Sequence, residues 1–213
     1  PLPVPSMLNT RRVFSAFWVA YLLSYLFRTV NAVVSPELTR DFELGPGTLG
    51  LLTSAYFVTF AAVQLPAGVL LDRYGPRRVE SALLVLGATG ALLFALAESA
   101  MGLVAARALI GAGVAVCLMA PLKAIAAWMP RERQASLAGW IMTAGSAGAL
   151  AAATPTELAL HYVHWRTLFA GLAVLTFAAA VWIWLRVPDT AKPTEGPNVG
   201  ALWAGVRSLF LHS

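Results

Sequence analysis

The sequence predicts an all-α membrane protein built as a bundle of six transmembrane helices. Hydrophobic residues make up 59% of the 213 residues and charged residues only 12%, against roughly 45–50% and 25% in soluble domains. The charged residues also gather in short stretches that separate long apolar runs. Both observations are typical of a chain whose solvent is lipid.

Each expected helix is justified by length and hydropathy, because a helix needs about 20 mainly apolar residues to cross a bilayer. Six segments qualify, and short polar stretches connect them. They are residues 13–34, 47–71, 79–97, 101–128, 135–157 and 166–186. The first run is too long for a secretory signal sequence, and no cleavage-site pattern follows it. We therefore expect it to remain as a helix.

Basic residues in the short connections predict the orientation of the bundle. One side carries Arg11, Arg12, Arg73, Arg77, Arg78, Arg131, Arg133, Arg186 and Lys192, whereas the other carries Arg40 and Arg166. This asymmetry predicts that both termini are cytoplasmic. Residues 1–12 are then a cytoplasmic segment, 13–186 form the membrane domain, and 187–213 form a cytoplasmic linker and the start of an interfacial helix.

Several functional classes are disfavoured. The net charge of +5 reflects residues that flank the membrane rather than one basic patch, so we expect no nucleic-acid partner. Cys117 lies in an apolar run and is expected to be a packing residue. His161 and His164 superficially suggest a metal pair, but loop histidines beside a tryptophan are more often interfacial. We find no enzyme motif and expect neither a cofactor nor a metal.

The connection after the second segment carries the most specific motif. Residues 68–78 read GVLLDRYGPRR and resemble the G-x-x-x-D-R-x-G-x-R-R signature of the major facilitator superfamily. The matching residues are Gly68, Asp72, Arg73, Gly75, Arg77 and Arg78. The resemblance implies a cytoplasmic loop in which Asp72 acts as a latch against a helix of a second bundle. The arginines can equally be topological signals.

Small residues in the fourth and fifth segments support a closely packed bundle. "RALIGAG" contains Arg107, Gly111 and Gly113 and resembles a family element, while "TAGSAGAL" contributes Gly145 and Gly148. Such residues let membrane helices approach closely. The resemblance covers residues 13–186 and implies the N-terminal half of a twelve-helix fold, made of two three-helix inverted repeats. It also implies a missing C-terminal half as the partner.

The first segment resembles particular families within this superfamily. "YLFRTVNAVVSPEL" is similar to the anion:cation symporters and to the organophosphate:phosphate antiporters, which place an arginine eight residues before a proline, as Arg28 stands to Pro36. Phe27 occupies a position where the symporters commonly have an aspartate, and Asn31 is shifted by one residue. Gly145 is followed by serine rather than by the proline of drug antiporters, which disfavours drug efflux.

Arg28 is the principal candidate for substrate binding. Tyr21, Ser24, Asn31 and Ser35 share its helical face and form a polar stripe. An intramembrane arginine is costly unless it faces a cavity or a partner, and its planar donor fork suits carboxylate or phosphate. The alternative is a structural ion pair with a carboxylate of the missing half.

Other polar residues have two interpretations. Arg107 either serves the same cavity or binds backbone carbonyls of the first helix. Gln64 either lines the cavity or bonds to a neighbouring helix, and Lys123 is expected to extend to the interface. Acidic residues such as Glu80 and Glu157 lie near segment ends, so the sequence offers no obvious proton carrier.

The leading hypothesis is a secondary transporter of small organic anions in the bacterial inner membrane, with H⁺ or Na⁺ as candidate coupling ions. A truncated, non-transporting membrane scaffold is an alternative. A drug or cation efflux carrier is another.

Overall fold

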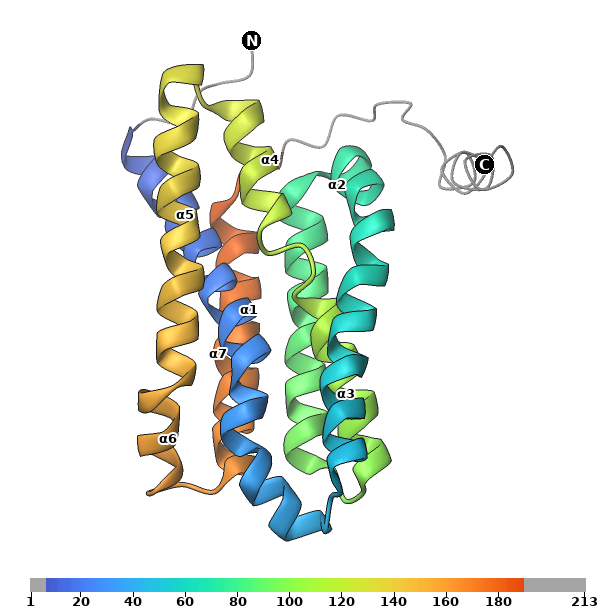
Figure 1. Cartoon of the computed structure of the whole chain (residues 1–213). Coiled ribbons are helices and arrows are strands. Elements are labelled where there is room, and N and C mark those ends of the chain that lie inside the picture. The colour runs from blue at the N-terminus through green and yellow to red at the C-terminus, as the bar shows by residue number, and fades with distance from the viewer. Residues whose placement is uncertain (1–6, 190–213) are drawn as a thin grey trace, which may run out of the picture.

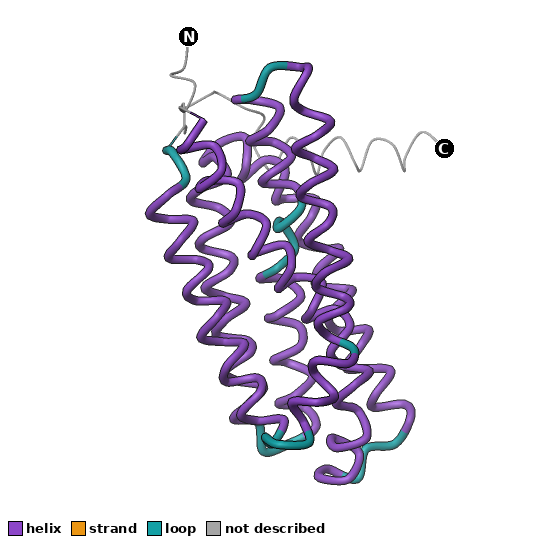
Figure 2. Tube along the Cα trace, turned by 90° about the vertical axis from the view of Figure 1, so that its left-hand side faces the viewer, coloured by secondary structure: helices purple, strands orange, loops and turns teal. Residues whose placement is uncertain are grey.

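The structure is a computed structural model that describes residues 7–189, and these form an all-helical bundle (Figure 1). The prediction of an all-α protein is confirmed. The helices lie along one long axis, with most connections at its two ends (Figure 2). They are α1 (Met7–Phe42), α2 (Pro46–Leu96), α3 (Ala100–Gly113), α4 (Met119–Trp128), α5 (Arg131–Ala152), α6 (Thr154–Leu160) and α7 (Trp165–Arg186).

Helix α2 consists of two arms, residues 46–74 and 76–96, that run in opposite directions from a turn at Gly75 (Figure 1). Gly75 has φ 77° and ψ 163°, a conformation that only glycine adopts without strain. Pro76 follows at a position where its fixed φ favours helix initiation and its missing N–H removes no bond. The predicted second and third segments are therefore joined by a tighter turn than the sequence suggested.

The fourth predicted segment, residues 101–128, is wrong as a continuous helix. Residues 114–118 form turns between α3 and α4, and Figure 2 shows a loop segment inside the bundle. Pro121 explains the position of the break, because its ring crowds the carbonyl four residues earlier, on Cys117, and cannot donate to it. The freed backbone is partly satisfied by Ser24, whose hydroxyl donates to the Val114 carbonyl over 3.3 Å.

Two further predicted segments contain a proline, and only one of them is interrupted. The predicted helix 135–157 is interrupted at Ala153, two residues before Pro155, where α5 ends and α6 begins. Helix α1, in contrast, continues through Pro36. The Ser35 hydroxyl donates over 2.8 Å to the Ala32 carbonyl, the group that Pro36 leaves without an N–H partner. As a result α1 extends beyond the predicted end at residue 34, and it also begins before the predicted start at residue 13.

Four helices are individually long and apolar enough to cross a membrane, namely 10–42, 46–96, 131–160 and 165–186. This number is smaller than the six predicted segments for two physical reasons. The two arms of α2 count once because they join without a loop, and the break at 114–118 leaves α3 and α4 each too short.

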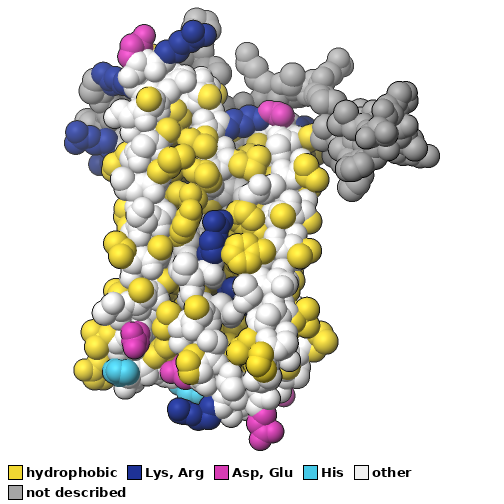
Figure 3. Space-filling view, in the orientation of Figure 1, with side chains coloured by type: hydrophobic (Ala, Val, Ile, Leu, Met, Phe, Trp, Pro, Cys, Tyr) yellow, Lys and Arg dark blue, Asp and Glu magenta, His cyan; other side chains and the backbone are white. Residues whose placement is uncertain are grey.

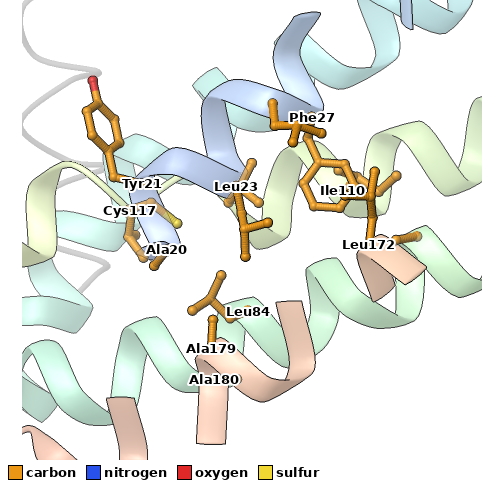
Figure 4. Packing of buried hydrophobic residues seen from close by; sticks show 14 of the residues in the cluster. Ala20, Tyr21, Leu23, Phe27, Leu84, Ile110, Cys117, Leu172, Ala179 and Ala180 are labelled. Carbon is orange, nitrogen blue, oxygen red and sulfur yellow. The ribbon is translucent and has the colours of Figure 1, made fainter. Parts of the chain in front are cut away.

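The core lies where α2 packs against α3 and α7, and where α1 packs against α5 and α7. Figure 4 shows side chains of α1, α2, α3 and α7 in this core, including Leu84 of α2 beside Ala179 and Ala180 of α7. All three of these side chains belong to one continuous apolar cluster. Because lipid tails are as apolar as leucine, close packing rather than water exclusion holds such helices together.

The four glycines that the sequence assigned to helix packing all lie at helix crossings. A Cβ on Gly113 would overlap the Gly87 backbone, and one on Gly111 would overlap the Tyr56 carbonyl. A Cβ on Gly148 would overlap the Leu22 carbonyl, and one on Gly145 would lie 2.9 Å from the Tyr25 ring. These contacts join α3 to both arms of α2, and α5 to α1.

Both the start of α1 and the end of α7 lie at one end of the bundle, together with the turn of α2 and the α4–α5 connection (Figure 1). Basic side chains gather at this end (Figure 3). We refer to it as the arginine-rich end; its residues are Arg11, Arg12, Arg73, Arg77, Arg78, Arg131, Arg133 and Arg186. Lys192 and the predicted linker from residue 190 onward lie outside the described residues.

Candidate substrate-binding site

A hollow of about 760 Å³ opens between α1 and the first arm of α2. Figure 3 shows a basic side chain within a depression midway along the bundle. Helix α1 contributes Arg28, Thr29, Asn31, Ala32 and Ser35 to the lining, and α2 contributes Leu49, Gly50, Thr53, Ser54 and Phe57. The predicted residues Arg28, Asn31 and Ser35 therefore meet in one cavity.

Arg28 is held by aromatic rings rather than by an acid. Its guanidinium carbon lies 4.6 Å from the centre of the Tyr25 ring, 4.9 Å from that of Phe60 and 6.0 Å from that of Phe57. No carboxylate among the described residues pairs with it, and its Nε is buried without a hydrogen-bond partner. Cation–π contacts offset part of the desolvation and leave donors available to an anion.

Asn31 and Thr53 add polar groups to the same wall. The Asn31 amide donates to the Thr53 hydroxyl over 3.1 Å, and that hydroxyl donates to the Leu49 carbonyl over 3.1 Å. The Asn31 carbonyl oxygen is buried and has no partner among the described residues. The hollow thus combines one fixed cation with hydroxyl and amide groups.

Two members of the predicted α1 stripe lie outside this lining. Ser24 is 1% exposed, and its hydroxyl donates to the broken segment at Val114. Tyr21 is buried against Tyr25, with ring centres 5.2 Å apart in an edge-to-face arrangement. The stripe turns away from the hollow along its length because the break in the α3–α4 segment occupies the space beside Ser24.

Arg107 does not reach the hollow. It is fully buried, its Nη1 donates over 2.9 Å to the Phe27 carbonyl, and its guanidinium lies 4.7 Å from the centre of the Tyr56 ring. Of the two interpretations of Arg107, this geometry is that of a link between α3 and α1. Gln64 is half-buried on the first arm of α2 and is not part of the lining.

Sequence reasoning named Gln64 of α2 but missed the α2 residues that line the hollow. Gly50, Thr53, Ser54 and Phe57 follow helical spacing and share one face of the first arm. That spacing is visible in the sequence. The spacing does not, however, determine which face of the first arm packs against α1.

The 68–78 signature forms the turn of α2 at the arginine-rich end. Gly75 occupies the turn, and Arg77 lies over Trp184 of α7, with 4.7 Å from the guanidinium carbon to the ring centre. Arg78 donates to the Asp189 carboxylate through Nη2 at 2.6 Å and Nε at 3.1 Å. A Cβ on Gly68 would meet nothing within 4 Å, and the Arg73 guanidinium carbon lies 5.4 Å from the Tyr74 ring centre.

Asp72 forms an ion pair with Lys123 of α4. Lys123 thus binds a residue of the signature, a partner that the sequence did not suggest. The side chain of Asp72 is 68% exposed even in this pair. Asp72 thus remains accessible to a further partner.

Glu80 lies near the start of the second arm of α2, as the sequence indicated, but its burial was not expected. It is fully buried in the second arm of α2, and both carboxyl oxygens lack hydrogen-bond partners among the described residues. Glu157 on α6, which also lies near the end of a predicted segment, is exposed. Its depth distinguishes Glu80 from every other described carboxylate.

At the opposite end of the bundle, His164 lies against α1. Its Nε2 is 3.3 Å from Asp41 Oδ2, an oxygen that also accepts a 2.7 Å hydrogen bond from the Trp165 indole. His161, His164 and Asp41 line one cavity of about 340 Å³. The described residues contain no group of three or more His, Cys, Asp or Glu arranged to hold a metal.

Comparison with curated proteins finds bacterial transporters. The chain is 29% identical to the hexuronate transporter of Escherichia coli (strain K12) over 163 residues, covering 76% of this chain and 38% of that protein. It is 26% identical to the D-galactonate transporter of Escherichia coli O6:H1 over 183 residues, covering 84% of this chain and 41% of that protein. The chain thus spans about two-fifths of the length of these relatives.

Solved structures share the fold. A bacterial homologue of the human lysosomal transporter Spinster, inward-facing and unoccupied, matches with a TM-score of 0.77 at 20% identity, covering 91% of this chain and 45% of that one. A proton:xylose symporter matches with a TM-score of 0.68 at 19% identity, covering 85% and 46%. A family model described as Major Facilitator Superfamily matches residues 17–213. Because that match covers most of the chain, the protein is a member of the Major Facilitator Superfamily and not an enzyme.

Proposed function

We propose that this chain is the N-terminal half of a twelve-helix secondary transporter that moves small organic anions across the cytoplasmic membrane. Its six passes are α1, the two arms of α2, α3 with α4, α5 with α6, and α7. They form two three-helix inverted repeats, with both termini and the arginine-rich end in the cytoplasm. A C-terminal bundle supplies the opposite wall of the site, and the two bundles rock to give alternating access.

One observation is the main support for an anionic substrate: Arg28 lines a hollow in the bundle and has no carboxylate partner among the described residues. A cation at such depth is expensive unless it is used. An anion entering the hollow would meet this guanidinium together with the polar groups of Asn31, Thr53 and Ser54. Those groups suit a hydroxylated carboxylate, and two of the bacterial relatives are transporters of hexuronate and D-galactonate.

The binding test uses the complete carrier and D-galactonate as the probe. Arg28→Lys retains the charge but loses the planar fork. Because a charge-assisted hydrogen bond contributes about 1.5–3 kcal/mol, the affinity should fall roughly ten- to a hundredfold. Thermal stability should be unchanged. Arg40→Lys, an exposed arginine outside the hollow, is the matched control and should bind normally.

A structural ion pair predicts a different pattern. Arg28→Lys would then bind D-galactonate with wild-type affinity, while Arg28→Ala would reduce the amount of folded protein. That pattern would end the anion-site proposal. Absence of transport by the wild-type carrier would favour the scaffold alternative.

A further inference from the structure

Glu80 is the one carboxylate that the described part of the bundle encloses completely. It is 0% exposed, and neither carboxyl oxygen has a hydrogen-bond partner there. It lies just after the signature turn, on the second arm of α2, which packs against α3 and α7. The substrate hollow does not include it. The function of this carboxyl is therefore independent of direct contact with the substrate.

The elements packed around this arm supply no counter-ion for Glu80. No cation among the described residues pairs with it, and the basic residues of the neighbouring elements have other surroundings. Lys123 of α4 binds Asp72, and Arg107 of α3 donates to the Phe27 carbonyl. Arg78 binds Asp189, and Arg77 stacks on Trp184. Arg28 faces the hollow, and Arg186 at the end of α7 is exposed.

The titratable neighbour of Glu80 is the buried thiol of Cys117. A thiol carries no positive charge at neutral pH, so it cannot balance a carboxylate. An ionised carboxylate without a cation or donors is very unfavourable away from water. The neutral acid avoids that penalty because it carries no charge.

Cys117 belongs to the broken segment 114–118, which also contacts α1. At its other end, the Val114 carbonyl accepts the hydrogen bond from Ser24. Ser24 lies one helical turn before Arg28, and its carbonyl accepts a 3.4 Å hydrogen bond from the Tyr56 hydroxyl. One irregular segment thus touches both the surroundings of Glu80 and the helix that carries Arg28. Irregular backbone at membrane depth is a common element of ion sites in transporters.

We propose that Glu80 is a proton-binding site that couples proton movement to transport. Glu80 holds a proton while segment 114–118 packs beside it. When α1 and this segment separate during the transport cycle, the O–H bond breaks and the proton passes to water entering from the arginine-rich end. The carboxylate then accepts a proton from water that enters from the opposite side of the membrane, and the segment closes again. The coupling role rests on the proposed transport function, whereas proton binding does not.

Infrared spectroscopy of this chain in lipid nanodiscs tests proton binding directly. At pH 7 the wild type should show the C=O stretch of a protonated carboxylic acid, and ¹³C-labelled glutamate should shift that band. Glu80→Gln should lack the band. Glu98→Gln, which alters an exposed carboxylate in the α2–α3 connection, should retain it. Absence of a glutamate-derived acid band from the wild type would overturn the proposal without requiring any variant to fold.

Proteoliposomes containing the complete carrier and an internal pH indicator test coupling. The wild type should move protons with D-galactonate. The proton flux of Glu80→Gln should be at least tenfold lower than that of the wild type, while the variant still exchanges labelled D-galactonate. Equal proton flux in the variant would overturn the coupling role. Absence of any transport by the wild type would remove the proposed function and the coupling role together, while the infrared band would still decide proton binding.

Discussion

Two intramembrane arginines show how surroundings assign different roles to the same side chain. Arg107 is enclosed and donates to a backbone carbonyl of α1. Arg28 instead lies among three aromatic rings at the edge of a hollow. The first arrangement uses the guanidinium to join helices. The second leaves donors for a ligand, which is why substrate binding is proposed for Arg28 alone.

Asp72 and Lys123 offer a test of the latch. The Asp72 side chain is 68% exposed and that of Lys123 33%, and exposed pairs contribute only about 0.2–1 kcal/mol. We therefore expect Asp72→Asn and Lys123→Gln each to change the free energy of unfolding of this chain by no more than that amount, as measured by titration with denaturing detergent. In the complete carrier, Asp72→Asn should slow transport while membrane insertion stays normal.

The two variants together identify the working partner of Asp72. If Asp72 acts on the opposite bundle, Lys123→Gln should transport at close to the wild-type rate. Equal loss in both variants would assign the function to the Asp72–Lys123 pair instead. Unchanged rates in both would remove Asp72 from the mechanism.

Among the helices, proline positions and small residues decide where the elements bend and meet. Pro121 accounts for the break between α3 and α4, while Ser35 lets α1 continue through Pro36. Next to the break, α3 crosses the second arm of α2 so closely that only glycine fits at Gly113. The same region therefore combines an irregular backbone with a tight crossing.

Gly113→Ala tests this crossing. The new Cβ would overlap the Gly87 backbone, so the helices must separate, and overpacking of this kind costs about 1–3 kcal/mol. Gly139→Ala on α5 is the matched control, because nothing lies within 4 Å of its Cβ position. The control should be neutral or stabilising by up to about 1 kcal/mol. Thermal unfolding in detergent measures both, and equal midpoints would contradict the tight crossing.

For the bundle as a whole, the basic residues of the arginine-rich end predict how the molecule sits in the membrane. Cysteine labelling with a membrane-impermeant maleimide provides the test, since the native Cys117 is buried and should not react. His164→Cys should react from outside intact cells. Glu132→Cys, exposed at the start of α5, should react only after permeabilisation. The reverse pattern would invert the proposed orientation.

The helical class, the family signature and the candidacy of Arg28 could be predicted from the residues alone, because hydropathy and short motifs are local properties of a chain. Which helix faces meet is not a local property. It depends on how segments far apart in the sequence pack together, and it became known only with the folded bundle.

Three outcomes depended on that packing. Ser24 and Tyr21 share the α1 stripe with Arg28, yet they turn into the core because the broken segment and α5 occupy the space beside them. Gly50, Thr53, Ser54 and Phe57 became part of the site only because this face of α2 meets α1. Glu80 stands near the end of a predicted segment, but the surrounding helices enclose it completely. Helical periodicity tells which residues share a face, whereas burial depends on what the neighbouring helices place against that face.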